Sequence, residues 1–319
     1  MPTSSDFVLA VDLGGTSFRV ALCDADGRVV RRVRRPTLPE QGADAVIVRV
    51  IDAAREISIG VPNVRAVGVA SPGPLNPFTG VVLYVSTLGW IDVPLRDRLA
   101  AALGLPTAID NDANLAALGE QKYGAARGAR DMAYVTLSTG IGCGVILDDR
   151  LVRGARGLAT ELGNISVQFD SPVDHFGLPG ALEALAAGPA IAALAQRRMA
   201  AGEASAMRDL VDGRIESITA REVGEAANAG DAVAQSIVRH AARIIGIGVV
   251  NLLHMFDPAI VVIGGSVSTM GAVLWEPLRA TVRECAMPPY REIPLVPAAL
   301  GDDSGLLGAA ALAHSFVVM

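Results

Sequence analysis

An internal repeat is the feature that most constrains the fold of this chain. The segment VLAVDLGGTSFRVALCD, residues 8–24, reads as an apolar strand, a polar residue, a glycine-rich turn with threonine, a second apolar strand and an acidic end. The segment MAYVTLSTGIGCGVILDD, residues 132–149, follows the same order. Repeated units of this kind indicate two related lobes. We therefore expect each lobe to begin with an antiparallel hairpin whose turn points at a common cleft.

Strands and helices alternate along the rest of the chain. Apolar runs predict buried strands at 7–13, 64–70 and 259–265, and helical patterns are found at 43–59, 95–103, 112–123, 231–256 and 304–315. Thr219 and Glu222 have the spacing of a capping box at a helix start. This alternation is typical of α/β proteins, and 319 residues suit two domains. We predict an α/β fold of two lobes around a cleft.

Composition and charge exclude several classes of partner. The net charge is −6 and aromatic residues make up only 4%, so we expect no nucleic acid and no anionic membrane as partners. The basic segment 28–35 reads as a solvated edge strand. Residues 244–275 are interrupted by polar and turn residues, which predicts a buried helix, a turn and a strand rather than a membrane span. The first residues lack the pattern of a secretory signal, so we expect a soluble cytoplasmic protein.

The three cysteines are far apart in the sequence and odd in number, which argues against a disulfide framework. We expect Cys23, Cys143 and Cys285 all to be buried as small apolar residues.

Glycine-rich turns follow three of the predicted strands, at 12–16, 138–142 and 263–266. Glycine lets backbone amides approach an anion closely, and Thr16 and Thr139 add hydroxyl donors. Asp12 could hold Mg²⁺ through water, because Mg²⁺ loses its hydration reluctantly. Each turn alone could be ordinary turn chemistry, and Asp12 alone could be an Asx-turn residue. Three such turns at matching strand ends favour phosphate binding.

The segment IDNDANLAALGE, residues 109–120, places acid and amide side chains where a strand ends and a helix begins. Some of them could be helix caps, but capping does not require Asp110, Asn111, Asp112 and Asn114 together. The field at a helix N-terminus favours a charged carboxylate. Such a base suits accepting a hydroxyl proton during phosphoryl transfer.

These motifs together resemble the ROK family of sugar kinases and sugar-responsive repressors. DLGGT, VGVASPGP, TLGW, DNDANLAALGE, LSTGIGCGV, GLATELGN and IGG stand in that family's order across residues 8–313. The resemblance implies the actin-like, hexokinase-type (ribonuclease H-like) kinase fold, with ATP and sugar in the interdomain cleft. We also expect a homodimer or higher homo-oligomer. We place the lobe boundaries at 1–112 plus 300–319 and at 113–299, with the final helix packed on the N-terminal lobe.

The resemblance further implies a role for individual residues. Asp112 would be the general base on the sugar hydroxyl, and Asp12 would hold Mg²⁺ through water. The sugar would be bound by Gly73, Asn111, Asp112, Glu161, Asn164 and Glu183. The ATP phosphates would meet Asp12, Gly14, Gly15, Thr16, Thr139 and Gly140, while the adenosine would lie close to Gly264 and Gly265.

One loop departs from the family pattern. Members commonly carry a histidine and three cysteines that bind structural zinc, and the corresponding positions here are Asn164, Asp174, Phe176 and Ala181. Zinc favours a Cys₃His tetrahedron that this set cannot form, so we predict no zinc. His175 lies one place off that frame and reads as an ordinary surface histidine. Local packing of Pro172, Phe176 and Pro179 is expected to brace the loop instead.

The leading functional hypothesis is ATP-dependent phosphorylation of a hexose, with glucose as the reference sugar. Thr87 and Thr160 stand where the family commonly has Asn and Gly near the sugar, and one changed hydrogen-bond partner can shift selectivity strongly. Fructose, an N-acetylhexosamine or a polyol therefore remain alternative substrates, and polyphosphate an alternative donor. A non-catalytic, sugar-binding regulator is the alternative class. Repressors of the family carry a DNA-binding head before the DxGGT strand, where this sequence has only a few residues.

Overall fold

The computed structural model describes residues 6–316, so the N-terminal residues examined for a signal lie partly outside it. The strands are β1 Phe7–Leu13, β2 Ser17–Cys23, β3 Val29–Pro36, β4 Val64–Ser71, β5 Leu75–Asn76, β6 Val81–Val85, β7 Trp90–Val93, β8 Thr107–Asn111, β9 Met132–Leu137, β10 Ile141–Leu147, β11 Arg150–Leu151, β12 Asp174–His175, β13 Leu178–Pro179, β14 Ile260–Gly264 and β15 Leu295–Pro297. The α-helices are α1 Gly42–Ser58, α2 Leu95–Leu103, α3 Asp112–Tyr123, α4 Leu182–Ala186, α5 Gly188–Ala200, α6 Ala220–Asn228, α7 Ala232–Phe256, α8 Ala272–Cys285 and α9 Ser304–His314. Strands and helices alternate as predicted, and the mixed α/β class is confirmed.

The chain forms two compact units. The first comprises the residues up to 134, residues 144–160 and the residues from 298 onward, and the second comprises 135–143 and 161–297. The expected lobes, 1–112 plus 300–319 and 113–299, stay a prediction. The compact units differ from them because α3, β11 and most of β10 group with the first unit.

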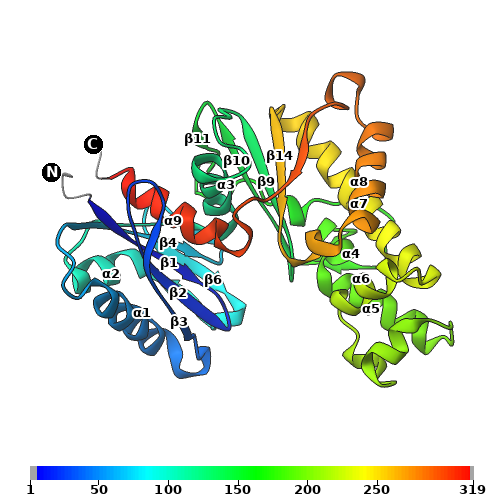
Figure 1. Cartoon of the computed structure of the whole chain (residues 1–319), viewed down its shortest axis with the longest axis horizontal. Helices are drawn as coiled ribbons and strands as arrows, with labels where there is room; N and C mark the ends of the chain where they lie inside the picture. Colours follow the sequence, from blue (N-terminus) through cyan, green and yellow to red (C-terminus); the bar gives the residue numbers. More distant parts are fainter. Residues whose placement is uncertain (1–5, 317–319) are drawn as a thin grey trace. The chain divides into compact units, whose positions relative to one another are not determined.

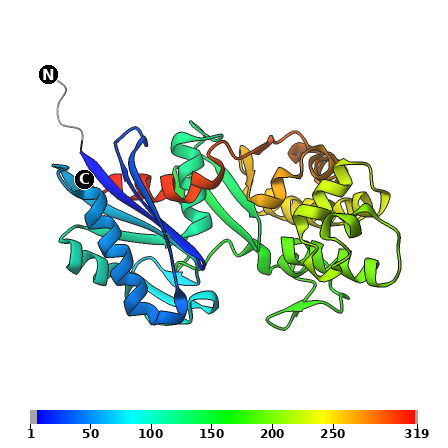
Figure 2. The same cartoon turned by 60° about the horizontal axis from the view of Figure 1, so that its bottom comes forward.

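The first unit is built on a sheet of order β3-β2-β1-β4-β8. Strands β1, β4 and β8 are parallel, whereas β2 and β3 are antiparallel to their neighbours. Alternate residues of β1 enter different cores: Leu9 and Val11 pack with residues of α1, and Val8 and Ala10 pack with residues of α9. Figures 1 and 2 show these two helices on opposite faces of the sheet. The near-continuous apolar sequence of β1 follows from this burial on both faces.

Helix α9 approaches its neighbours so closely that glycine is required at the contacts. A Cβ at Gly308 would lie 1.6 Å from the carbonyl oxygen of Leu115 in α3. A Cβ at Gly68 in β4 would lie 1.9 Å from the carbonyl oxygen of Ala309. The predicted packing of the final helix on the N-terminal part of the chain is confirmed, and the same contacts explain why α3 belongs to the first unit.

The second sheet has the order β11-β10-β9-β14-β15. This order matches that of the first sheet position by position, which confirms the repeat seen in the sequence. Helix α7 is apolar and long enough to cross a membrane, but 61% of its most apolar window is buried within the protein. It ends at Phe256, Asp257 with φ 46° caps it, and β14 follows, so the predicted helix, turn and strand are confirmed.

The cysteines separate into two kinds. Cys23 and Cys143 are buried as predicted, and burial raises the pKa of the Cys23 thiol to about 12. The prediction for Cys285 is wrong, because this residue is the last of α8 and is exposed.

Candidate functional site

The carboxyl ends of three parallel strands bring acidic residues together in the first unit. Asp12 in β1 pairs in register with Ala70 in β4, and Ala70 pairs with Asp110 in β8. Neighbouring strands lie about 4.8 Å apart, which places the two acids on one short row. Ligands of open α/β sheets bind beyond such strand ends. This edge is therefore the first candidate for a ligand site.

Residues 111 and 112 continue from this row into helix α3. The Asn111 Oδ1 caps the helix by accepting from the backbone nitrogen of Ala113 at 2.9 Å. Asp112 is exposed, and its Oδ1 accepts from the same nitrogen at 2.8 Å. A Cβ at Gly73 would lie 3.3 Å from Asn111 Nδ2, so the loop after β4 adjoins the amino group of Asn111. The structure thus brings together the sugar-binding residues that were predicted in the first unit.

Asp110 itself is buried and serves to position this segment. Its Oδ1 accepts from Asn111 N at 2.8 Å and from Asn114 Nδ2 at 2.9 Å, and its Oδ2 accepts from Arg153 Nε at 2.6 Å. Both carboxylate oxygens are therefore engaged, as a buried charge requires. Arg153 was missed from the sequence, because its loop lies 43 residues from Asp110 along the chain.

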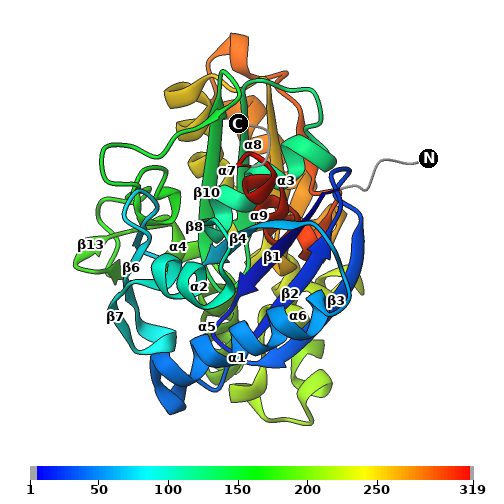
Figure 3. The same ribbon diagram turned by 90° about the vertical axis from the view of Figure 1, so that its left-hand side faces the viewer.

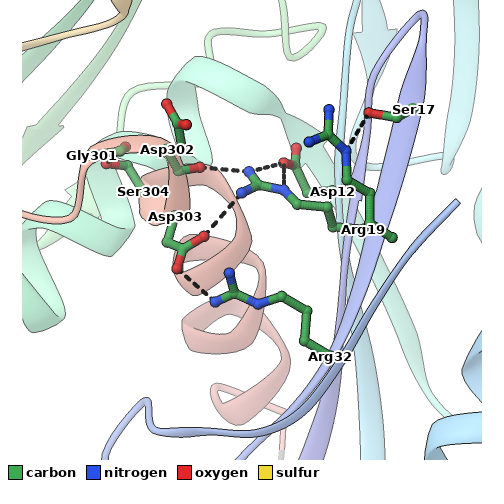
Figure 4. Close-up of polar contacts among 9 residues, drawn as sticks. Asp12, Ser17, Arg19, Arg32, Gly301, Asp302, Asp303 and Ser304 are labelled. Carbon is green, nitrogen blue, oxygen red and sulfur yellow. Dashed lines mark hydrogen bonds and ion pairs between the residues drawn. The ribbon is translucent and has the colours of Figure 1, made fainter. Parts of the chain in front are cut away.

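Asp12 belongs to a chain of alternating charges, shown in Figure 4. Arg19 lies opposite Asp12 in the β1–β2 hairpin and donates from Nε to Asp12 Oδ2 at 3.1 Å. The same guanidinium donates to Asp303 Oδ1 at 2.9 Å, and Arg32 donates to Asp303 Oδ2 at 2.6 Å. The hairpin is thereby tied to the start of α9. Arg19 was also missed from the sequence, although the hairpin register could have indicated it.

The other oxygen of Asp12 has a different environment. Among the described residues, Asp12 Oδ1 accepts no hydrogen bond, and a Cβ at Gly305 in α9 would lie 3.7 Å from it and 3.8 Å from Asp112 O. One free carboxylate oxygen beside a glycine turn fits a Mg²⁺ ion that keeps its water and is held mainly by phosphates.

The glycine turn between β1 and β2 is closely packed. A Cβ at Gly14 would lie 2.8 Å from the carbonyl oxygen of Ser17, and one at Gly15 would lie 3.2 Å from the Thr87 hydroxyl. Thr16 at the tip is exposed. The turn therefore presents backbone and a threonine hydroxyl, as an anion-binding nest needs. Thr87, expected on the sugar side, lies against Gly15 of this glycine turn.

The second unit gathers its own predicted residues around the β9–β10 turn. Glu183 Oε2 accepts from Ile141 N at 2.7 Å, and a Cβ at Gly140 would lie 2.6 Å from that oxygen. Asn164 Nδ2 donates to Glu161 Oε2 at 3.0 Å. Gly163 links the Glu161–Asn164 pair to Glu183, because a Cβ added at Gly163 would lie 3.3 Å from Glu183 Cβ. The predicted sugar residues of this unit are thus neighbours.

The loop from 165 to 180 is not braced as predicted. Phe176 is 86% exposed, so its expected packing against the loop prolines is wrong. Backbone hydrogen bonds close the loop instead, including Val167 N to Gly180 O at 2.9 Å. Its tip is the β12–β13 hairpin, which projects from the unit (Figure 3).

His175 in this hairpin is not an ordinary surface residue. Its Nε2 lies 3.5 Å from Glu183 Oε1, and its side chain is 31% exposed. Glu183 therefore connects the hairpin to the β9–β10 turn. Among residues 6–316, no cluster of three or more His, Cys, Asp or Glu is arranged to hold a metal ion.

A pocket of about 840 Å³ lies wholly in the second unit. Ser138 and Thr139 of the β9–β10 turn line one part of it, and Ser138 Oγ lies 3.2 Å from Ser266 Oγ. Helices α5 and α6, the segment just before α6 and the residues after β14 supply the rest, with apolar contributions from Ala192, Val267 and Met270. The volume suits a ligand of nucleotide size.

The predicted adenosine residues border this pocket rather than line it. Gly264 ends β14 and Gly265, with φ 86°, turns the chain into Ser266, which does line the pocket. A Cβ at Gly265 would lie 2.3 Å from the carbonyl oxygen of Leu137, so glycine is needed for this turn. The lining residues of α5 and α6 carried no recognisable signal in the sequence.

Comparison with known proteins identifies the family. The family model described as "ROK family" matches residues 8–315. The chain is 36% identical to the glucokinase of Thermotoga maritima, over 96% of each chain. It is 34% identical to a ROK family glucokinase from Streptomyces griseus solved in complex with glucose and AMPPNP, with a TM-score of 0.84 over 97% of this chain and 99% of that one. It is also 28% identical to the xylose repressor of Caldicellulosiruptor bescii, over 87% of this chain and 70% of that protein. The chain belongs to the ROK family.

Proposed function

We propose that the protein phosphorylates a hexose hydroxyl with ATP, and that Asp112 is the general base. The observation that carries this proposal is the exposed Asp112 carboxylate at the start of α3, beside Asn111 and the Gly73 loop. The helix N-terminus favours its charged form, which is the form that accepts a proton. Glucose is the leading substrate, because the similar kinases named above are glucokinases.

The surrounding residues have complementary tasks in this proposal. Asn111 Oδ1 is used by the helix cap, so its amino group is the donor left for a sugar oxygen. Glu161 and Asn164 would bind further sugar hydroxyls. Catalysis of phosphoryl transfer is mostly positioning and charge stabilisation.

The phosphates would be bound by the two repeated turns, through Gly14, Gly15 and Thr16 in one and through Thr139 and Gly140 in the other. Mg²⁺ would neutralise phosphate charge, with Asp12 Oδ1 accepting from its water. The nucleoside would occupy the pocket between α5 and α6, near Gly264 and Gly265. We also propose a cytoplasmic homodimer without structural zinc.

A coupled ADP-release assay tests this function. Purified protein is incubated with ATP, Mg²⁺ and each of a panel of hexoses, N-acetylhexosamines and polyols, with Asp112→Asn as the blank. The expected result is sugar-dependent ADP release, strongest with a glucose-like hexose. Absence of stimulation by every sugar would favour a sugar-binding regulator.

A further inference from the structure

Two amide side chains line the pocket of the second unit in a fixed orientation. Gln196 Nε2 in α5 donates to the backbone oxygens of Glu216 and Ile218, at 3.2 and 2.9 Å. Asn228 Nδ2 at the end of α6 donates to the backbone oxygens of Gly224 and Met270, at 2.8 and 2.9 Å. Backbone oxygens only accept hydrogen bonds, so each amide must direct its amino group toward them. The assignment of N and O is therefore set by the partners.

The carbonyl oxygens of these two amides are left available. Neither Gln196 Oε1 nor Asn228 Oδ1 accepts a hydrogen bond from any residue in the range 6–316. Two hydroxyls of the lining are already used: the Thr219 hydroxyl donates to Glu222, and the Thr269 hydroxyl donates to the backbone oxygen of Ser266. The lining also carries the exposed carboxylates Glu216 and Glu225, which bring charge rather than a fixed amide. Two residues that line the pocket thus each keep an amide oxygen that can still accept a hydrogen bond.

We infer that Gln196 and Asn228 are specificity-determining residues that select a 6-amino purine over a 6-oxo purine. An exocyclic amino group donates hydrogen bonds to such acceptors, whereas a 6-oxo group presents a further acceptor at the same position. An amide oxygen that faces position 6 is then left unpaired, and N1–H is the only donor that the 6-oxo base offers beside it. This inference rests on the proposed function, because it takes the nucleotide base to lie in this pocket. Arg221, an exposed cation of the lining, is the group that would favour a 6-oxo base instead.

Direct binding measurements separate this inference from the proposed function. Calorimetric titration of the full chain with Mg²⁺ and ATP, purine riboside triphosphate or ITP compares amino, hydrogen and oxo groups at position 6. We expect ATP to bind about tenfold more tightly than ITP, with the unsubstituted purine between them. Equal binding of ATP and ITP, or tighter binding of ITP, would overturn the inference and leave the kinase function intact. Absence of binding by all three would instead remove the proposed nucleotide site.

Variants assign the selectivity to the amides. Gln196→Ala and Asn228→Ala are made separately, so that a folding defect in one, checked by thermal unfolding, leaves the other informative. Each substitution should weaken ATP binding several-fold and ITP binding little. The ratio of the ITP to the ATP dissociation constant should therefore fall. Arg221→Ala is the matched control and should keep or increase the preference for ATP. Retention of the full wild-type ratio in both alanine variants would contradict the assignment.

Discussion

The two repeated turns share a scaffold but differ in how acidic groups reach them. Both follow a central strand of a sheet with the same order, and both expose glycine backbone. In the first, the acid is Asp12 on the strand itself, held across the hairpin by Arg19. In the second, Thr136 stands at the corresponding place, and Glu183 from α4 receives the backbone N–H of Ile141.

This difference shows that the same hairpin can have its acidic residue either on its own strand or on a neighbouring helix. The strand-borne carboxylate keeps one oxygen free, which suits a hydrated metal ion beside phosphates. The second turn has its acid occupied by its own backbone, and it adjoins the nucleotide-sized pocket instead. The two turns thus share their backbone arrangement, and neighbouring side chains give each one different surroundings.

The largest expected effect is at the proposed base. Asp112→Asn should lower kcat by about 10²–10⁴-fold, because the amide cannot accept the hydroxyl proton. Sugar binding, measured by calorimetry, should change only a few-fold, because an amide still forms hydrogen bonds. Asp97→Asn, at an exposed site in α2, is the control and should behave like wild type. Near-normal turnover of Asp112→Asn would remove this residue from the mechanism.

A smaller effect is expected for the partner of Asp12. Arg19→Ala removes the group that fixes Asp12 Oδ2 and should lower kcat by about tenfold, with the sugar KM little changed. Arg32→Ala is the matched control, because Arg32 contacts Asp303 in the same charge chain but not Asp12. Arg19→Lys should restore part of the loss. Equal effects of the Arg19 and Arg32 substitutions would mean that the network serves stability alone.

The substitution Glu161→Gln tests the proposed sugar contact in the second unit. This change should raise the sugar KM by about tenfold and the ATP KM much less, because a charged hydrogen-bond acceptor for a sugar hydroxyl is lost. Glu284→Gln, at an exposed position of α8, is the control. Steady-state kinetics with each substrate varied would show the split. A parallel rise in both KM values would take Glu161 out of the sugar site.

The smallest expected effect is the response to zinc chelation. A loop closed by backbone hydrogen bonds should retain its structure without a metal. Incubation with a chelator, followed by its removal and the return of Mg²⁺, should therefore leave the Tm and the sugar KM unchanged, and metal analysis should find no stoichiometric zinc. One tightly held zinc per chain would refute this prediction.

The sequence was sufficient to predict the helices, the strands and the internal repeat, because hydrophobic periodicity, capping residues and glycine turns are local signals. Helix α3 begins at Asp112 and α2 ends before Gly104, as the sequence predicts. Residues that act through distant partners were not predictable in this way. Arg153 reaches Asp110 from a loop, and His175 reaches Glu183 only because of the hairpin register.

Two of the wrong predictions share a physical cause. Phe176 and Cys285 were assigned to the interior from their apolar character, but an element's end or a hairpin tip can expose such residues. Burial depends on which neighbours cover a position, and a single sequence does not contain that information directly.

Product analysis tests the central claim most directly. Wild-type protein at high concentration is mixed with ATP, Mg²⁺ and the best sugar of the panel, and the products are identified by mass spectrometry. Sugar monophosphate should form in equal amounts with ADP, and Asp112→Asn should form both products about 10²–10⁴-fold more slowly. ADP without phosphorylated sugar, or no reaction with any sugar, would contradict the account.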